Sequence, residues 1–138
     1  MVKRLTTAVV LGLAAVLALG GPAAAVDFQP GDISGTWFMS AFGAYDVRGE
    51  SYSGFIVFDQ GTVVSGNGTH GSSQATWTGG GLSVNVLGQV EGIIQGRSDR
   101  NLQLNVKQGR LDLTKELVTF MAEDQLGVQM IVNMTKVQ

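Results

Sequence analysis

The sequence contains no cysteine, and this absence excludes several structures and chemistries at once. The chain forms no disulfide bonds, binds no metal through thiolates, uses no thiol nucleophile and carries no lipid of the bacterial lipoprotein type. Histidine occurs once, at position 70, so the clustered His and Cys ligands of zinc sites are also missing. No segment spaces oxygen ligands around a glycine as calcium loops do. We therefore expect no metal and no cofactor.

Charged residues are scarce as well, at 14% of the chain against a usual value of about 25%. Nine basic residues stand against eleven acidic ones, and the basic residues form no cluster. A nucleic-acid-binding protein needs such a cluster, so nucleic acid is not expected as a partner. Low charge together with many Ser, Thr, Asn and Gln residues is expected of a surface that is partly covered by protein neighbours, and it also occurs in ordinary secreted domains.

The N-terminal residues have the three parts of an export signal. Lys3 and Arg4 give a positive start, an apolar run of about a dozen residues follows, and small residues precede an expected cleavage after Ala25. Roughly 18 apolar residues would be needed for a membrane anchor. The sequence predicts a cleaved signal peptide over 1–25 and one domain over 26–138, located in the bacterial periplasm or outside the cell.

The remainder of the chain alternates apolar and polar residues in short segments separated by turn residues, which is the pattern of β-strands. The clearest segments are 82–86 and 102–106, where every second side chain is aliphatic. Gly79-Gly80-Gly81 and Gln108-Gly109 are interpreted as turns. Strands are expected at 33–42, 52–59, 62–69, 73–78, 82–87, 89–96, 101–107, 110–114, 117–122 and 126–137.

Because the connections are too short for crossovers, consecutive strands must be antiparallel neighbours. An open meander would leave two exposed edges, so we expect closure into an all-β up-and-down barrel of 8–10 strands, with a β-sandwich as the alternative. Most segments are too short, and too poor in aromatic residues, for a transmembrane barrel. The chain is therefore not expected to be a transmembrane protein.

The aliphatic face is expected to point inward and to fill the barrel, which leaves little room for a large cavity. Its expected members are Leu82, Val84, Val86, Val90, Ile94, Leu102, Leu104, Val106, Leu111, Leu113, Val118, Phe120, Val128, Met130, Val132 and Met134. The opposite face is polar, and Ile131 is an exception to this rule.

The segment Ile33-Ser34-Gly35-Thr36-Trp37 resembles the opening Gly-x-Trp strand of lipocalins and avidins, which are calycin-type barrels. The residues around Phe55 and Gly61 look like the second hairpin of such barrels. The resemblance implies an up-and-down barrel with Trp37 at its closed end and a ligand in its mouth. The later Thr-Asp-Tyr signature of lipocalins is missing, and Met39 and Gly43 stand where avidins have polar biotin contacts, so biotin binding is not expected.

The densest group of polar and aromatic residues follows the Trp37 strand, and we interpret it as a binding loop. Its candidate site residues are Tyr45, Asp46, Arg48, Glu50 and Tyr52. The tyrosines offer flat amphipathic surface, and the arginine offers a fork for carboxylates. An ordinary surface loop with local ion pairs is the alternative interpretation.

His70 lies in a stretch of Ser, Gly, Asn and Thr and is interpreted as a loop histidine. No spacing links it to a nucleophile and an acid such as Ser72 and Asp59, so no catalytic residue is assigned and no enzyme is expected.

Two functions remain open. The leading hypothesis is a non-enzymatic exported barrel that contacts a protein partner or self-assembles through its loop and exposed strands. The rival hypothesis is a calycin-like binder of a small apolar ligand at the barrel mouth, near Tyr45, Tyr52, Trp77 and His70.

Overall fold

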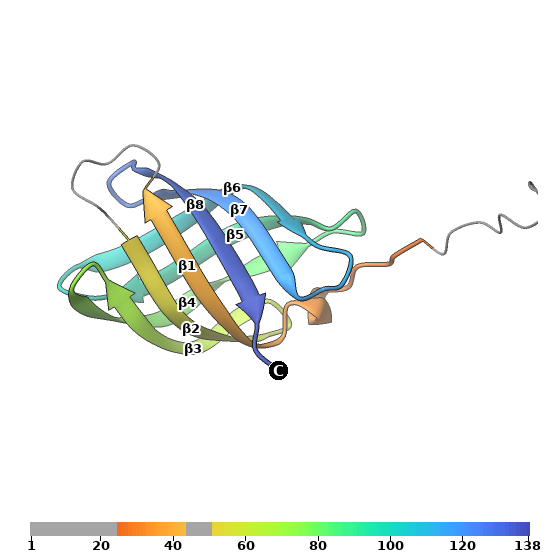
Figure 1. The fold of residues 1–138 in the computed structure, drawn as a ribbon, viewed down its shortest axis with the longest axis horizontal. Helices are drawn as coiled ribbons and strands as arrows, with labels where there is room; N and C mark the ends of the chain where they lie inside the picture. Colours follow the sequence, from red (N-terminus) through yellow and green to blue (C-terminus); the bar gives the residue numbers. More distant parts are fainter. Residues whose placement is uncertain (1–24, 44–50) are drawn as a thin grey trace, which may run out of the picture.

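The computed structural model describes residues 25–43 and 51–138, and these form one closed barrel of eight antiparallel strands (Figure 1). The strands are β1 (Gly35–Gly43), β2 (Ser51–Asp59), β3 (Thr62–His70), β4 (Ser73–Val84), β5 (Gln89–Arg97), β6 (Asn101–Leu111), β7 (Leu117–Asp124) and β8 (Gln129–Lys136). Each strand pairs with the next, and β8 pairs with β1 to close the sheet. The predicted fold class and closure are confirmed, and the sandwich alternative is wrong. The expected signal peptide lies almost entirely outside the described residues and stays a prediction.

Two of the predicted turns are wrong, which is why ten expected strands become eight. The three glycines at 79–81 lie inside β4, where Gly80 pairs with Ile94, and Gln108-Gly109 lies inside β6. Both places carry a register shift of the ladder, between Trp77 and Gly79 and between Val106 and Gln108. A β-bulge takes up an extra residue and bends the strand without ending it. Glycine marks bulges as well as turns, so the sequence signal was ambiguous.

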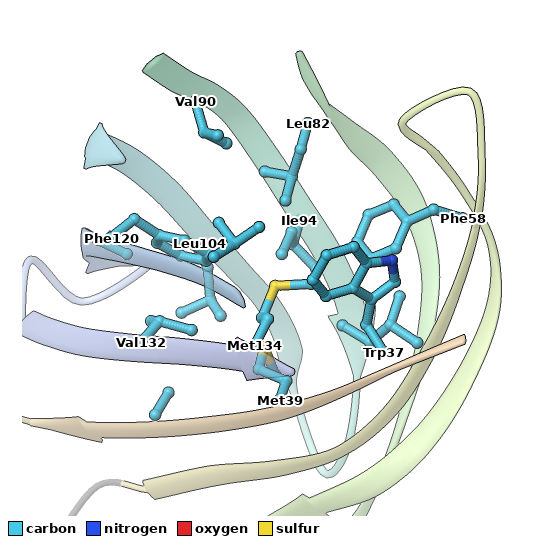
Figure 2. Packing of buried hydrophobic residues seen from close by; sticks show 14 of the residues in the cluster. Trp37, Met39, Phe58, Leu82, Val90, Ile94, Leu104, Phe120, Val132 and Met134 are labelled. Atoms are coloured by element: carbon cyan, nitrogen blue, oxygen red, sulfur yellow. The ribbon is translucent and has the colours of Figure 1, made fainter. Parts of the chain in front are cut away.

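The inward face forms a single apolar cluster, and Figure 2 shows its side chains directed from the surrounding strands into the barrel. Twelve of the sixteen expected core residues are buried: Leu82, Val84, Val90, Ile94, Leu102, Leu104, Leu111, Val118, Phe120, Met130, Val132 and Met134. Val106 and Val128 are partly buried. Val86 and Leu113 are exposed, contrary to expectation, because they lie beyond the ends of β4 and β6, where strand alternation no longer applies.

The segment before β1 covers one end of the barrel. It contains a single 3-10 turn, η1 (Pro30–Asp32), and it buries Phe28 and Ile33 against the core. Asp32 forms a salt bridge with Lys115, with an N–O distance of 2.9 Å. Trp37 follows immediately and is fully buried, so its expected role as a core anchor is confirmed.

Candidate functional site

The opposite end of the barrel, here called the mouth, gathers the end of β1, the start of β2 and the β3–β4, β5–β6 and β7–β8 turns. The candidate residues Tyr45, Asp46, Arg48 and Glu50 lie outside the described residues, so their role stays a prediction. The other three candidates, Tyr52, His70 and Trp77, lie on β2, β3 and β4 and are all buried.

These three side chains form one aromatic cluster inside the mouth. The rings of Tyr52 and His70 stack with centroids 4.7 Å apart, and the rings of Tyr52 and Trp77 lie 5.9 Å apart in a tilted arrangement. Tyr52 is directly opposite His70 in the β2–β3 register, so both point to the interior. The expectation of a loop histidine is wrong: His70 is the last residue of β3 and only 6% exposed.

His70 is held by the turn between β5 and β6. Its Nδ1 lies 3.1 Å from Ser98 Oγ, and its Nε2 lies 3.4 Å from Arg100 Nη2. A guanidinium only donates hydrogen bonds, so Nε2 accepts from Arg100, and Nδ1 carries the proton and donates to Ser98. Asp99 Oδ1 is 3.7 Å from the same Nδ1. The Ser98 hydroxyl donates to Asp99 and, despite some desolvation, lowers the pKa of that exposed carboxyl, with further help from the Arg100 charge.

Serine, histidine and aspartate thus meet at the mouth, which sequence spacing did not reveal. A catalytic triad places the serine on one ring nitrogen and the acid on the other, so that the histidine takes the serine proton. Here Ser98 and Asp99 both approach Nδ1, and that nitrogen already carries the proton. This arrangement positions the ring but gives Ser98 no base.

Asp124 also lies at the mouth, at the end of β7, whereas His70 is on β3. Asp124 is buried, and its Oδ1 accepts hydrogen bonds from the backbone N–H groups of Leu126 and Val128 at 2.8 and 2.9 Å. The Tyr52 hydroxyl donates to its Oδ2 at 3.3 Å. The sequence indicated a turn-forming role for Asp124, but not its contact with Tyr52. This bond joins β2 to β7 through the barrel interior.

The indole of Trp77 has room because the chain has glycine opposite it. A Cβ atom at Gly96 would lie 2.7 Å from Trp77 Cε3. The indole N–H groups of Trp77 and Trp37 are both buried and meet no acceptor among the described residues. A buried donor without a partner costs about 1–3 kcal/mol, which the packing of each large ring must offset.

The outside of the barrel carries a second candidate site. Phe38 and Phe42 on β1, Phe55 on β2 and Ile131 on β8 are exposed large apolar side chains on the outer face. Phe38 is paired in register with Phe55, and their rings are 5.3 Å apart. Phe42 is paired in register with Ile131. One signal of this surface is visible in the sequence, the break in polar alternation at Ile131.

Charge is distributed unevenly around the barrel. Among the described strands, the five contiguous strands β8, β1, β2, β3 and β4 contain only two charged side chains, Asp59 and Lys136, which end β2 and β8. The other three strands carry outward charges at Glu91, Arg97, Lys107, Arg110 and Glu123. We call the outer face of β8 and β1 to β4 the uncharged wall. The four exposed apolar residues named above lie on it, whereas Ile93 on β5 and Met121 on β7 are exposed apolar residues of the charged strands.

A groove of about 970 Å³ lies on the outer surface of the charged side, across the bulges of β5 and β6. Glu91, Lys107 and Arg110 line it, and Met121 and Ile131 form its border with the uncharged wall.

Among the described residues, no group of three acidic or histidine side chains could hold a metal ion. Within the same part of the chain, no helix has the length and apolar character needed to cross a membrane.

Comparisons with known proteins identify the fold alone. No family model and no curated protein matches the sequence. A redesigned β-barrel is similar in structure, with a TM-score of 0.59 and 14% identity over 83% of this chain and 100% of that one. A de novo designed fluorescence-activating β-barrel has a TM-score of 0.52 and 12% identity over 80% of this chain and 99% of that one. The chain is a small eight-stranded antiparallel barrel, which is the architecture that the calycin resemblance implied.

Proposed function

We propose that this chain is an exported, non-enzymatic barrel that serves as a protein-interaction or assembly subunit and works through its outer surface. The observation that carries the proposal is the contrast between the two faces of the sheet. The inner face is packed with apolar side chains, whereas the outer face exposes three phenylalanines on strands almost free of charge. Exposed aromatic side chains at the centre of a charge-poor patch are typical of protein interfaces.

The exposed apolar area of the three phenylalanines supports a role as a protein interface. A phenylalanine presents roughly 200 Å² when fully accessible. Phe38, Phe42 and Phe55 are 40%, 62% and 48% exposed, so together they present about 300 Å² of apolar surface. The largest patch on a typical monomer is about 300–600 Å² and is often functional. Ile131 extends the patch across β8.

The histidine geometry supports a non-enzymatic role. Among the described residues its Nδ1 donates to Ser98 and its Nε2 accepts from Arg100, so the ring is not placed to take a proton from the Ser98 hydroxyl.

The test is capture of envelope proteins by matched variants. The full chain is expressed in an exporting bacterial host and used as bait, with Ile131→Gln on the uncharged wall and Ile93→Gln on β5 as its control. Both isoleucines are exposed on outer strand faces, so the substitutions have similar effects on stability. We expect Ile93→Gln to capture as the unmodified protein does and Ile131→Gln to lose capture. Equal behaviour of the two variants, or a monomer in light scattering that captures nothing, would contradict the proposal.

A calycin-like ligand site at the mouth is the second candidate. The observation that favours it is the buried cluster of Tyr52, His70 and Trp77, in which the Trp77 indole N–H meets no acceptor among the described residues. A small, largely apolar molecule with one acceptor atom would satisfy that donor. Native mass spectrometry of protein taken from its source tests this candidate. A bound small molecule that Trp77→Phe releases would support it, and the bare polypeptide mass would count against it.

A further inference from the structure

We propose that the partner of the uncharged wall is a second copy of this chain, in a two-fold dimer centred on Ser40. This inference rests on the proposed function, because it names the partner of the same surface. Ser40 lies on the outer face of β1, midway between Phe38 and Phe42.

Barrel closure determines how two copies can meet. β1 and β8 pair along their length, so the described strands leave no free edge to which a partner could add a strand. Association must therefore occur through outward side chains. Of the outer faces, that of β8, β1 and β2 combines exposed aromatic residues with the absence of mid-strand charge.

Charge favours an identical partner. The chain has a net charge of −2, and its charged strand residues gather on β5, β6 and β7. When two uncharged walls face each other, the charged strands of both copies point away from the contact, so like charges of the described strands do not meet. A strongly charged partner would find no countercharge on this wall to offset the cost of its desolvation.

The arrangement of the four apolar side chains is self-complementary. The Phe38 and Phe55 pair lies on one side of Ser40, on β1 and β2, and the Phe42 and Ile131 pair lies on the other side, on β1 and β8. The two pairs are therefore related by an approximate half-turn about Ser40. A two-fold axis between the two walls, perpendicular to β1, brings the first pair of one copy against the second pair of the other. Each end of the contact then joins four apolar side chains, as an isologous interface requires.

The centre of this contact is polar and small. Ser40 pairs in register with Ser53 on β2 and with Asn133 on β8. In the two-fold dimer the two Ser40 residues face each other across the axis, since residues on the axis meet their own copies. A charge introduced at position 40 would therefore meet the same charge from the partner, which gives a direct test.

The experiment is sedimentation velocity on Ser40→Lys, Ser40→Glu and their equimolar mixture. The unmodified full chain is expressed in an exporting host and compared with each variant over a range of concentrations. We expect the unmodified protein to dimerise and each charged variant to weaken dimerisation at least tenfold. The mixture should recover a heterodimer, because lysine then faces glutamate. Circular dichroism of each variant shows that loss of the dimer is not loss of the fold, and Ile93→Gln should leave the dimer unchanged.

The outcomes separate the two proposals. A protein that stays monomeric at every concentration, or a mixture that recovers no heterodimer, overturns the second copy as partner. If Ile131→Gln then still abolishes capture of envelope proteins, the wall has another partner and the proposed function stands. If Ile131→Gln instead captures envelope proteins as the unmodified protein does, the proposed function fails as well.

Discussion

At the scale of single residues, Asp32 connects the segment before β1 to the barrel. Its carboxylate accepts a hydrogen bond from the backbone N–H of Gln29 at 2.8 Å and a salt bridge from Lys115 at 2.9 Å. Partial burial raises the pKa of Asp32, but these two partners outweigh burial and hold the pKa below its ordinary value of 3.8. Because the pKa is lower in the folded protein, the carboxylate stabilises the fold above the ordinary pKa and loses this effect as the pH falls through the folded value.

We therefore expect Asp32→Asn to lower the free energy of unfolding by about 1 kcal/mol at pH 7. The difference from the unmodified protein should vanish as both are taken to acid pH, since protonation removes the same charge. Urea unfolding at a series of pH values measures this, with the exposed Asp59→Asn as control. A difference that persists unchanged at pH 2 would show that the charge of Asp32 is not the cause.

The mouth illustrates what residue types and spacing can predict. Tyr52, His70 and Trp77 were identified as neighbours from their places near one end of a barrel, and they are in contact. Spacing does not identify the partners Ser98 and Asp124, because they lie 28 and 72 residues along the chain from His70 and Tyr52. A side-chain contact across a barrel leaves no periodic signal, whereas burial on one face of a strand does.

At the scale of elements, the three glycines in β4 are the main difference between prediction and structure. Gly80 has a φ of +80°, and a Cβ atom there would overlap the carbonyl oxygen of Ile93 on β5. Gly127, in the turn before β8, has nearly the same φ of +79°, but a Cβ atom there would meet nothing within 4 Å. A residue with a side chain would therefore suffer the same backbone strain at both positions. Only at Gly80 would its Cβ atom also clash with a neighbouring strand.

We expect Gly127→Ala to destabilise the protein by about 1–2 kcal/mol through backbone strain. Gly80→Ala should cost at least about 2 kcal/mol more, because β4 and β5 must also separate. Chemical denaturation of the two variants measures the difference. Equal losses would indicate that residues 79–81 form an open turn, as the sequence alone predicted.

At the scale of the whole molecule, closure of the barrel was predictable and the asymmetry of its surface was not recognised. Short turns impose antiparallel neighbours, and an open meander would leave two edges, so the pairing of β1 with β8 followed from the chain. The uncharged wall also has a sequence signal, since the stretch 60–84 contains no Asp, Glu, Lys or Arg. The fraction of charged residues in the whole chain, 14%, conceals this signal because it averages the two sides of the barrel.

Association through the uncharged wall covers the outer aromatic side chains and leaves the surroundings of the inner ones unchanged. The most direct measurement is NMR of protein with labelled phenylalanine rings over a dilution series. We predict that Phe38, Phe42 and Phe55 change their chemical shifts with concentration and that the buried Phe58 and Phe120 do not. Shifts confined to the buried rings, or no change at any concentration for the three outer rings, would contradict it.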